Sequence, residues 1–318
     1  ALNTLYSLSR LHQKNTKGIE YEVIIVENQS SDCLNENEIK KLGPEFHYHL
    51  RQENSKSPVG AMNFGISQAT GSHLCMMIDG ARMVTPRVIE YLHMAFRASE
   101  NSLVAVPGYS IGWQDQHILN STEYNELIEE QLLDEINWKI DGYRLFDISV
   151  LSGANINGVY NPYMECNCIT TSRKNFEELK EIDMSFQQAG GGSINLHVYR
   201  QLGLVSQKSK FFVLPGEGSF HQYHKGITTS PWQDLAETLL SHRTELHSHW
   251  PAGFSSLTRE PTQLGSINKC SIDVLKFSNF KAMKRFTRLT KEKSQLWRDD
   301  QPNTPRWISN ERLPSSIS

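Results

Sequence analysis

The sequence predicts an α/β fold in which a mostly parallel central sheet is flanked by helices and followed by a C-terminal helical extension. Two apolar segments, 21–27 and 72–79, end in Glu27 and Asp79, and helical sequence separates them. In open α/β sheets, the groups that meet phosphate, metal or sugar lie beyond the carboxyl ends of the strands. Strand-like and helical segments then alternate to about residue 110, as in a doubly wound parallel sheet.

The elements of this first part follow from the spacing of apolar residues. Leucines recur at every third position from Leu2 to Leu11, which predicts an opening helix. Val23 to Val26 is a continuous β-branched run, typical of a strand covered on both faces. We also expect strands over 46–50, 72–78 and 103–106, and helices over 60–70 and 86–96, the second capped by Thr85 and Pro86.

After residue 110 the pattern changes. Residues 123–136 predict an acidic amphipathic helix whose charges form a solvated face. Residues 141–164 are rich in loop-forming residues and predict a lid or acceptor loop. We expect strands over 166–170 and 211–214 and helices over 174–180, 193–202 and 230–249, the last capped by Ser230 and Pro231. Beyond about Arg259 the sequence is basic and polar, which predicts a peripheral helix and tail. The alternative is that this positively charged segment binds a membrane or a protein partner.

The composition limits the class of protein. A hydrophobic content of 38% and a net charge of −3 over 318 residues are typical of a soluble globular protein, and they exclude a disordered or strongly nucleic-acid-seeking chain. No apolar run approaches the ~20 residues that a membrane span needs. Five scattered cysteines favour a reducing compartment, which predicts a cytoplasmic protein. Cys166 and Cys168 are too close for a zinc pair and predict buried thiols.

Three motifs in the first 110 residues resemble family 2 glycosyltransferases with the GT-A (Rossmann-like) fold. The segment 22–32 resembles the hydrophobic strand and V-D-N-x-S-x-D of the family, and 63–71 resembles its N-x-G-I-x-x-A-x-G segment. The segment 74–81 falls where the family places its metal-binding D-x-D. The resemblance implies a transferase for a nucleotide-linked hexose. The family's usual first strand would lie before Ala1, so we expect this chain to be a fragment or a trimmed form.

The resemblance also implies a division of the chain into three parts. Residues 1–110 would be the nucleotide-sugar-binding half of the GT-A domain and residues 111–229 its acceptor-side half. Residues 230–318 would be the C-terminal helical extension and basic tail.

The motifs assign roles to particular residues. Glu27 stands where the family's acid contacts the nucleobase, and a carboxylate there suits the ring N–H of uracil, which predicts a UDP-sugar. Asn28 belongs to the same turn, which Asp32 holds in place. Asn63 lies on the helix that lines the pocket. Asp79 matches the first acid of D-x-D, which meets the ribose or the metal shell; taken alone, it could equally be a strand cap.

The second acid of the D-x-D motif is replaced by Ala81. A divalent cation such as Mn²⁺ or Mg²⁺ needs oxygen or nitrogen donors, and a methyl group supplies none. Three explanations remain open: metal held by Asp79 and a distant ligand, metal-free catalysis with a cation such as Arg82, or lost activity. The glycine-rich loop 216–224 offers His221 and His224 as the distant ligands, since some GT-A enzymes complete the site with a C-terminal histidine.

A second departure concerns the catalytic base. Inverting members of the family have an acidic pair before the helix that precedes the final strand, whereas Gly190-Gly191-Gly192-Ser193 stands there in this chain. A missing base costs about 10²–10⁴ in rate. The substitutes that the sequence offers are Asp183, Glu165 and His197; a retaining enzyme would not need that base in the same position. The histidines at 242, 247 and 249 are expected at the surface or in packing.

The resemblance therefore implies a glycosyltransferase that transfers a sugar from a nucleotide sugar to a glycan or another hydroxyl acceptor. Glu27 predicts that the nucleotide is UDP. The alternative is a catalytically silent GT-A binding or scaffold module of a larger carbohydrate-processing protein. A nucleotidyltransferase is disfavoured, because no glycine-rich basic phosphate-binding segment occurs near the N-terminus.

Overall fold

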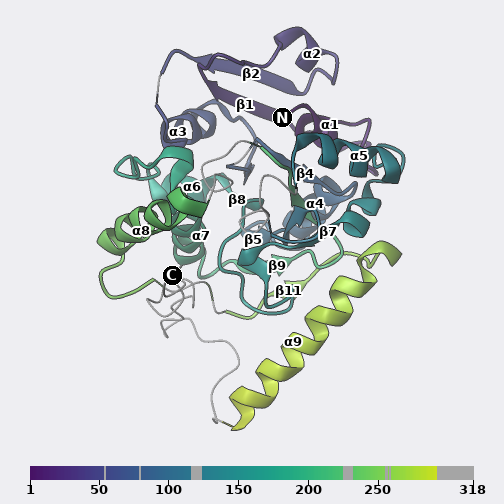
Figure 1. Cartoon of the computed structure of the whole chain (residues 1–318), viewed down its shortest axis with the longest axis vertical. Coiled ribbons are helices and arrows are strands. Elements are labelled where there is room, and N and C mark those ends of the chain that lie inside the picture. Colours follow the sequence, from purple (N-terminus) through teal and green to yellow (C-terminus); the bar gives the residue numbers. More distant parts are fainter. Residues whose placement is uncertain are drawn as a thin grey trace.

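The computed structural model confirms an α/β fold with sheets flanked by helices and a C-terminal helix (Figure 1). It describes residues 1–53, 55–78, 80–115, 124–224, 232–254, 257 and 259–291, without the side chains of 232–236 and 289. Asp79, the expected cap at Ser230 and Pro231, and the tail after Lys291 lie outside the described residues.

The central sheet has the strand order β11-β9-β5-β8-β3. Its strands are β3 (His73–Met76), β5 (Ser102–Ala105), β8 (Ile169–Ser172), β9 (Lys210–Val213) and β11 (Thr262–Gln263). Within the described part of this sheet, β3, β5, β9 and β11 share one direction and β8 runs opposite to them. The sheet is therefore mostly parallel, as predicted.

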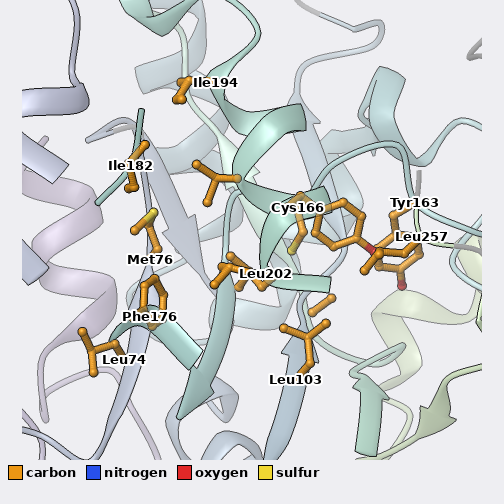
Figure 2. Close-up of a cluster of buried hydrophobic side chains, with 14 of the residues drawn as sticks. Leu74, Met76, Leu103, Tyr163, Cys166, Phe176, Ile182, Ile194, Leu202 and Leu257 are labelled. Carbon is orange, nitrogen blue, oxygen red and sulfur yellow. The ribbon is translucent and has the colours of Figure 1, made fainter. Parts of the chain in front are cut away.

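Helices α3 (Val59–Gln68), α6 (Arg173–Leu179), α7 (Ile194–Val205) and α8 (Trp232–His249) gather on one side of this sheet (Figure 1). Figure 2 shows the core that they help to close, in which Leu74 and Met76 of β3 and Leu103 of β5 pack with Phe176 and Leu202 of α6 and α7. Helix α4 (Val88–Ala98) packs on β5 through a separate apolar cluster. These helices confirm the predicted ones to within about three residues. Cys166 and Cys168 are buried free thiols, as predicted.

A second, four-stranded sheet has the order β4-β10-β6-β7. It contains β4 (Arg82–Val84), β6 (Gly108–Ile111), β7 (Ser149–Leu151) and β10 (Ser219–His221). The sequence did not predict these strands, because three or four residues are too few for an alternating pattern to be read. Helix α5 (Glu126–Ile136) and the 3₁₀ helices 142–148 and 153–155 occupy the predicted acidic helix and loop-rich segment; shorter 3₁₀ helices span 189–191 and 269–271.

The chain begins with α1 (Leu2–Leu8), followed by the parallel pair β1 (Val23–Asn28) and β2 (Phe46–Arg51), with α2 (Glu36–Lys40) between them. β1 and β3 are both edge strands of their sheets among the described residues. Residues of both strands and of α3 line one largely apolar cavity of about 460 Å³.

The last described element is α9 (Ile272–Lys291), which extends away from the body of the molecule (Figure 1). Among the described residues, no helix combines the length and apolar character needed to cross a membrane.

Candidate functional site

The carboxylate predicted to contact the nucleobase lies at the carboxyl end of β1. Glu27 Oε2 accepts hydrogen bonds from the hydroxyl of Tyr48 at 2.6 Å and from the backbone N–H of Leu34 at 3.0 Å. These two donors fix the orientation of the carboxylate. An ionised carboxyl group has about four acceptor positions, so the group can also accept from a ligand N–H.

The amides of Asn28 and Asn63 are used differently. Asn28 Nδ2 donates to the Ser55 carbonyl at 3.3 Å, while its buried Oδ1 has no hydrogen-bond partner among the described residues. A buried acceptor in this condition is typical of a site that lacks its ligand or water. Asn63 on α3 instead binds both backbone groups of Ile182, at 2.8 and 2.9 Å, and so fixes the segment next to Asp183. A ligand contact by either amide stays a prediction.

The altered D-x-D segment is held against the glycine-rich loop 216–224. The Ala81 carbonyl accepts from the backbone N–H of Gln222 at 2.7 Å. The Thr4 hydroxyl donates to the Gly80 carbonyl at 2.8 Å and accepts from Gln222 Nε2 at 3.1 Å. Ala81 itself is buried. The segment that follows Asp79 therefore has a fixed backbone, and its methyl group occupies a closed position.

The antiparallel pairing of β10 with β4 places His221 opposite Arg82, which is largely buried. His221 Nε2 and His224 Nε2 are 3.0 Å apart. Imidazole nitrogens bind a divalent ion at about 2.0–2.1 Å, so two adjacent ligands of one ion have about this separation and the pair fits a metal. Within the described ranges, no group of three or more His, Cys, Asp or Glu side chains is placed to hold a metal ion. Asp79, the third predicted ligand, is outside those ranges.

Glu129 of α5 lies beside this histidine pair, and the sequence did not predict it as a site residue. Its side chain is buried, in contrast to the solvated face expected for the charges of this helix. The Tyr124 hydroxyl donates to Glu129 Oε2 at 2.9 Å and the backbone N–H of Tyr223 at 2.7 Å. Burial raises the pKa of Glu129 to about 7, against the opposing effects of those two donors and of His224. Glu129 is thus a group that can gain or lose a proton near neutral pH.

Two of the three predicted bases, Asp183 and His197, lie beside His249 in the second half of the sequence. Asp183 Oδ2 is 3.3 Å from His249 Nδ1, at the end of α8. The hydroxyl of Ser185 lies 2.7 Å from Asp183 Oδ1 and 3.2 Å from His249 Nε2. Hydrogen bonds from the hydroxyl and the backbone N–H of Ser185 lower the pKa of Asp183. Asp183 is therefore an ionised carboxylate that can orient the imidazole of His249.

His197 of α7 lies next to this pair, with its ring centroid 5.4 Å from that of His249. Burial lowers the pKa of His197 to about 4, so this imidazole is neutral at physiological pH. Its Nδ1 accepts from the indole N–H of Trp250 at 3.1 Å. Glu165, the third predicted base, instead accepts from Asn167. Their catalytic roles stay predictions, and the geometry favours Asp183.

A carboxylate does lie beside the triple glycine, although the sequence places none there. Glu245 Oε1 of α8 accepts from the backbone N–H groups of Gln187 and Gln188 at 2.9 and 3.3 Å. A Cβ added to Gly192 would lie only 2.7 Å from Glu245 Oε2, so the glycine leaves room for this side chain. No local motif signals the contact, because 53 residues separate the two positions.

Residues 2–152 match the family model described as glycosyl transferase family 2. This region, just under half of the chain, is similar to family 2 glycosyltransferases. The match confirms the resemblance of the three motifs. The family 2 region runs from α1 into the end of β7 and includes Glu27, Asn63 and Ala81, whereas both histidine clusters lie beyond it.

Several solved structures are similar to the chain. A crystal structure of S. aureus TarS 1–349 in complex with UDP-GlcNAc has a TM-score of 0.46 and 12% identity, covering 91% of this chain and 70% of that one. TarS 1–349 in complex with UDP has a TM-score of 0.43 and 11% identity, covering 92% and 71%. A longer TarS structure has a TM-score of 0.41 and 13% identity, covering 77% and 37%. None of the curated proteins compared with the sequence matches it.

The family 2 match supports a glycosyltransferase that uses a nucleotide sugar.

Proposed function

We propose that the protein transfers a sugar from a UDP-sugar to a hydroxyl group of a glycan or another acceptor. The observation that carries the proposal is the pairing of β4 with β10, which brings His221 and His224 against the altered D-x-D segment. Glu27 and Asn28 would receive the uracil end of the nucleotide, and Asp79 and Arg82 the ribose and diphosphate end.

A divalent ion, Mn²⁺ or Mg²⁺, would be held by His221, His224 and Asp79 in place of the missing second acid. When bound, such an ion neutralises charge on the leaving diphosphate. Arg82 lies opposite His221 in the strand register and adds a fixed positive charge from the protein. These groups stabilise developing negative charge without themselves exchanging a proton.

Asp183 and His249 would activate the acceptor. A hydroxyl bound where the Ser185 hydroxyl now approaches His249 Nε2 can pass its proton to the imidazole, and the ionised Asp183 stabilises the resulting imidazolium. The base would then combine a residue from the proposed acceptor half, 111–229, with one from the proposed extension, 230–318. The proposed boundary at 229 would therefore not separate catalytic from accessory sequence, while 1–110 remains the proposed nucleotide half.

Calorimetric titration of UDP-sugars and Mn²⁺ tests the proposal. We expect UDP-sugar binding that depends on the metal. A His221→Ala/His224→Ala variant should bind Mn²⁺ roughly tenfold or more weakly, because loss of even a hydrogen-bond partner of a metal ligand costs about 10–100-fold in metal affinity. A His47→Ala/His247→Ala variant, which removes two exposed imidazoles, is the matched control. Unchanged Mn²⁺ affinity in the first variant, with no UDP-sugar binding, would favour the catalytically silent module, to which the buried Ala81 also points.

The cellular setting is part of the same proposal. All five cysteines are free, which is consistent with a reducing compartment such as the cytoplasm. The predicted contact of the basic C-terminal segment with a membrane or a protein concerns α9.

A further inference from the structure

Among the described residues, the buried side chains of α9 lie in the first third of the helix. Ser278 is fully buried, and its hydroxyl accepts from the backbone N–H of Val159 at 3.0 Å. Leu275 is buried one turn earlier. After Ser278, the side chains of α9 that the structure describes are half-buried or exposed. The distal part of the helix therefore has an apolar content that the fold does not use.

That apolar content forms a stripe on the distal helix. Phe280, Met283 and Phe286 are 54%, 55% and 49% exposed. Residues three apart lie on the same side of a helix, since one turn takes about 3.6 residues. Three large exposed apolar side chains on one side are unusual for a surface that faces only water. This stripe needs a partner that buries it.

The rest of the distal helix is strongly basic. Between residues 274 and 291 the sequence has six Lys and Arg residues and no Asp or Glu. Lys284, Arg288 and Lys291 are exposed. The ammonium of Lys284 lies 4.4 Å from the ring centroid of Phe280, so a cation borders the apolar stripe directly. An anionic surface would therefore attract the side of the helix that carries the apolar stripe.

We infer that α9 is a peripheral membrane anchor whose distal part lies in the interface of an anionic lipid bilayer. Phe280, Met283 and Phe286 enter the boundary of the acyl chains, while Lys284, Arg288 and Lys291 remain at the level of the lipid phosphates. A protruding rod with cations beside its aromatic rings fits a flat charged surface. Each cation near such a surface strengthens the attraction. The inference does not depend on the proposed reaction.

Flotation of the full chain with lipid vesicles tests the anchor. We expect binding to vesicles of phosphatidylcholine mixed with phosphatidylglycerol, little binding to phosphatidylcholine alone, and weaker binding at high salt. The triple variant Phe280→Ser/Met283→Ser/Phe286→Ser should bind roughly tenfold or more weakly, since it removes three large apolar side chains from the lipid interface. Lys284→Glu/Arg288→Glu/Lys291→Glu should lose binding to a similar extent.

Two variants serve as matched controls. Lys17→Glu/Lys174→Glu/Lys208→Glu reverses three exposed cations outside α9 and should bind like the wild type. Ile140→Ser removes an exposed apolar side chain outside α9 and should bind like the wild type. Equal thermal midpoints would show that the variants remain folded. Absence of wild-type binding to anionic vesicles, binding unaffected by the triple serine change, or binding only to an acidic protein would each overturn the inference. Transfer activity in free solution is a separate readout and is expected to be unchanged.

Discussion

Two carboxylate–imidazole contacts in this molecule use the same chemical groups in opposite environments. Glu129 lies beside His224 in a buried position, and burial raises its pKa to about 7. Asp183 lies beside His249 at a more open position, where donors from Ser185 lower its pKa. One carboxyl can therefore carry a proton at neutral pH while the other stays ionised. Each environment therefore sets the protonation state of its own carboxyl group.

The largest effect is expected from Asp183→Asn, which removes the charge of the ionised carboxyl. The amide still accepts the hydrogen bonds of Ser185 but removes the charge that stabilises a protonated His249. We expect kcat for transfer to an acceptor hydroxyl to fall by about 10²–10⁴. The measurement is the steady-state rate with a UDP-sugar and acceptor. Glu165→Gln is the control, and a nearly unchanged rate in Asp183→Asn would assign the base elsewhere.

Glu129→Gln tests the other carboxyl through stability. Because the folded-state pKa of Glu129, about 7, lies above the ordinary value of 4.5 for a glutamate, the protonated group contributes stability that is fully present below about pH 4.5. That contribution is lost as the pH rises through about 7. Relative to Glu129→Gln, the wild type should lose on the order of 3 kcal/mol between pH 4.5 and 8.5.

Urea unfolding of both proteins at the two pH values measures this difference. Glu130→Gln changes an exposed neighbour on the same helix and should leave the pH dependence of the wild type intact. Parallel behaviour of wild type and Glu129→Gln would mean that Glu129 is ionised throughout.

Gly192→Ala tests the contact between the triple glycine and Glu245 on the proposed acceptor side. The residue has φ of 54°, and its added Cβ would meet Glu245. We expect a loss of about 1–3 kcal/mol in the free energy of unfolding. The loss should be smaller in a Glu245→Ala background, because the shortest clash is then removed, while the contact with Gln188 and the backbone strain remain. A double-mutant cycle measures the coupling; additive effects would contradict the contact.

The smallest effect is expected from Ser185→Ala. Removal of the hydroxyl that contributes most to lowering the pKa of Asp183 should raise that pKa. The acid limb of the pH–rate profile should move to higher pH, with the maximal rate changed little. Ser67→Ala, which removes an exposed hydroxyl on α3, should leave the profile in place.

The sequence predicted the regular part of the fold well, because β1, α3 and α4 have apolar spacings long enough to identify. It did not predict the sheet that joins Arg82 to His221, since that sheet consists of strands of three or four residues. It also assigned Glu129 to solvent, because its burial depends on a contact with Tyr223, which is 94 positions away. The pairing of Asp183 with His249 likewise arises only when α8 packs against the core. Such contacts leave no local pattern.

β1 and β3 each have an edge that no described strand covers, so another strand could pair with the first half of the protein. Both edges border the same largely apolar cavity, and their N–H and C=O groups must pair with water or with another strand. An extended segment that paired with either edge would add one strand to that sheet. Its binding energy would be added to the stability of the fold. Occupancy of this gap would thus set how firmly Glu27 is fixed relative to the strand that leads to Asp79.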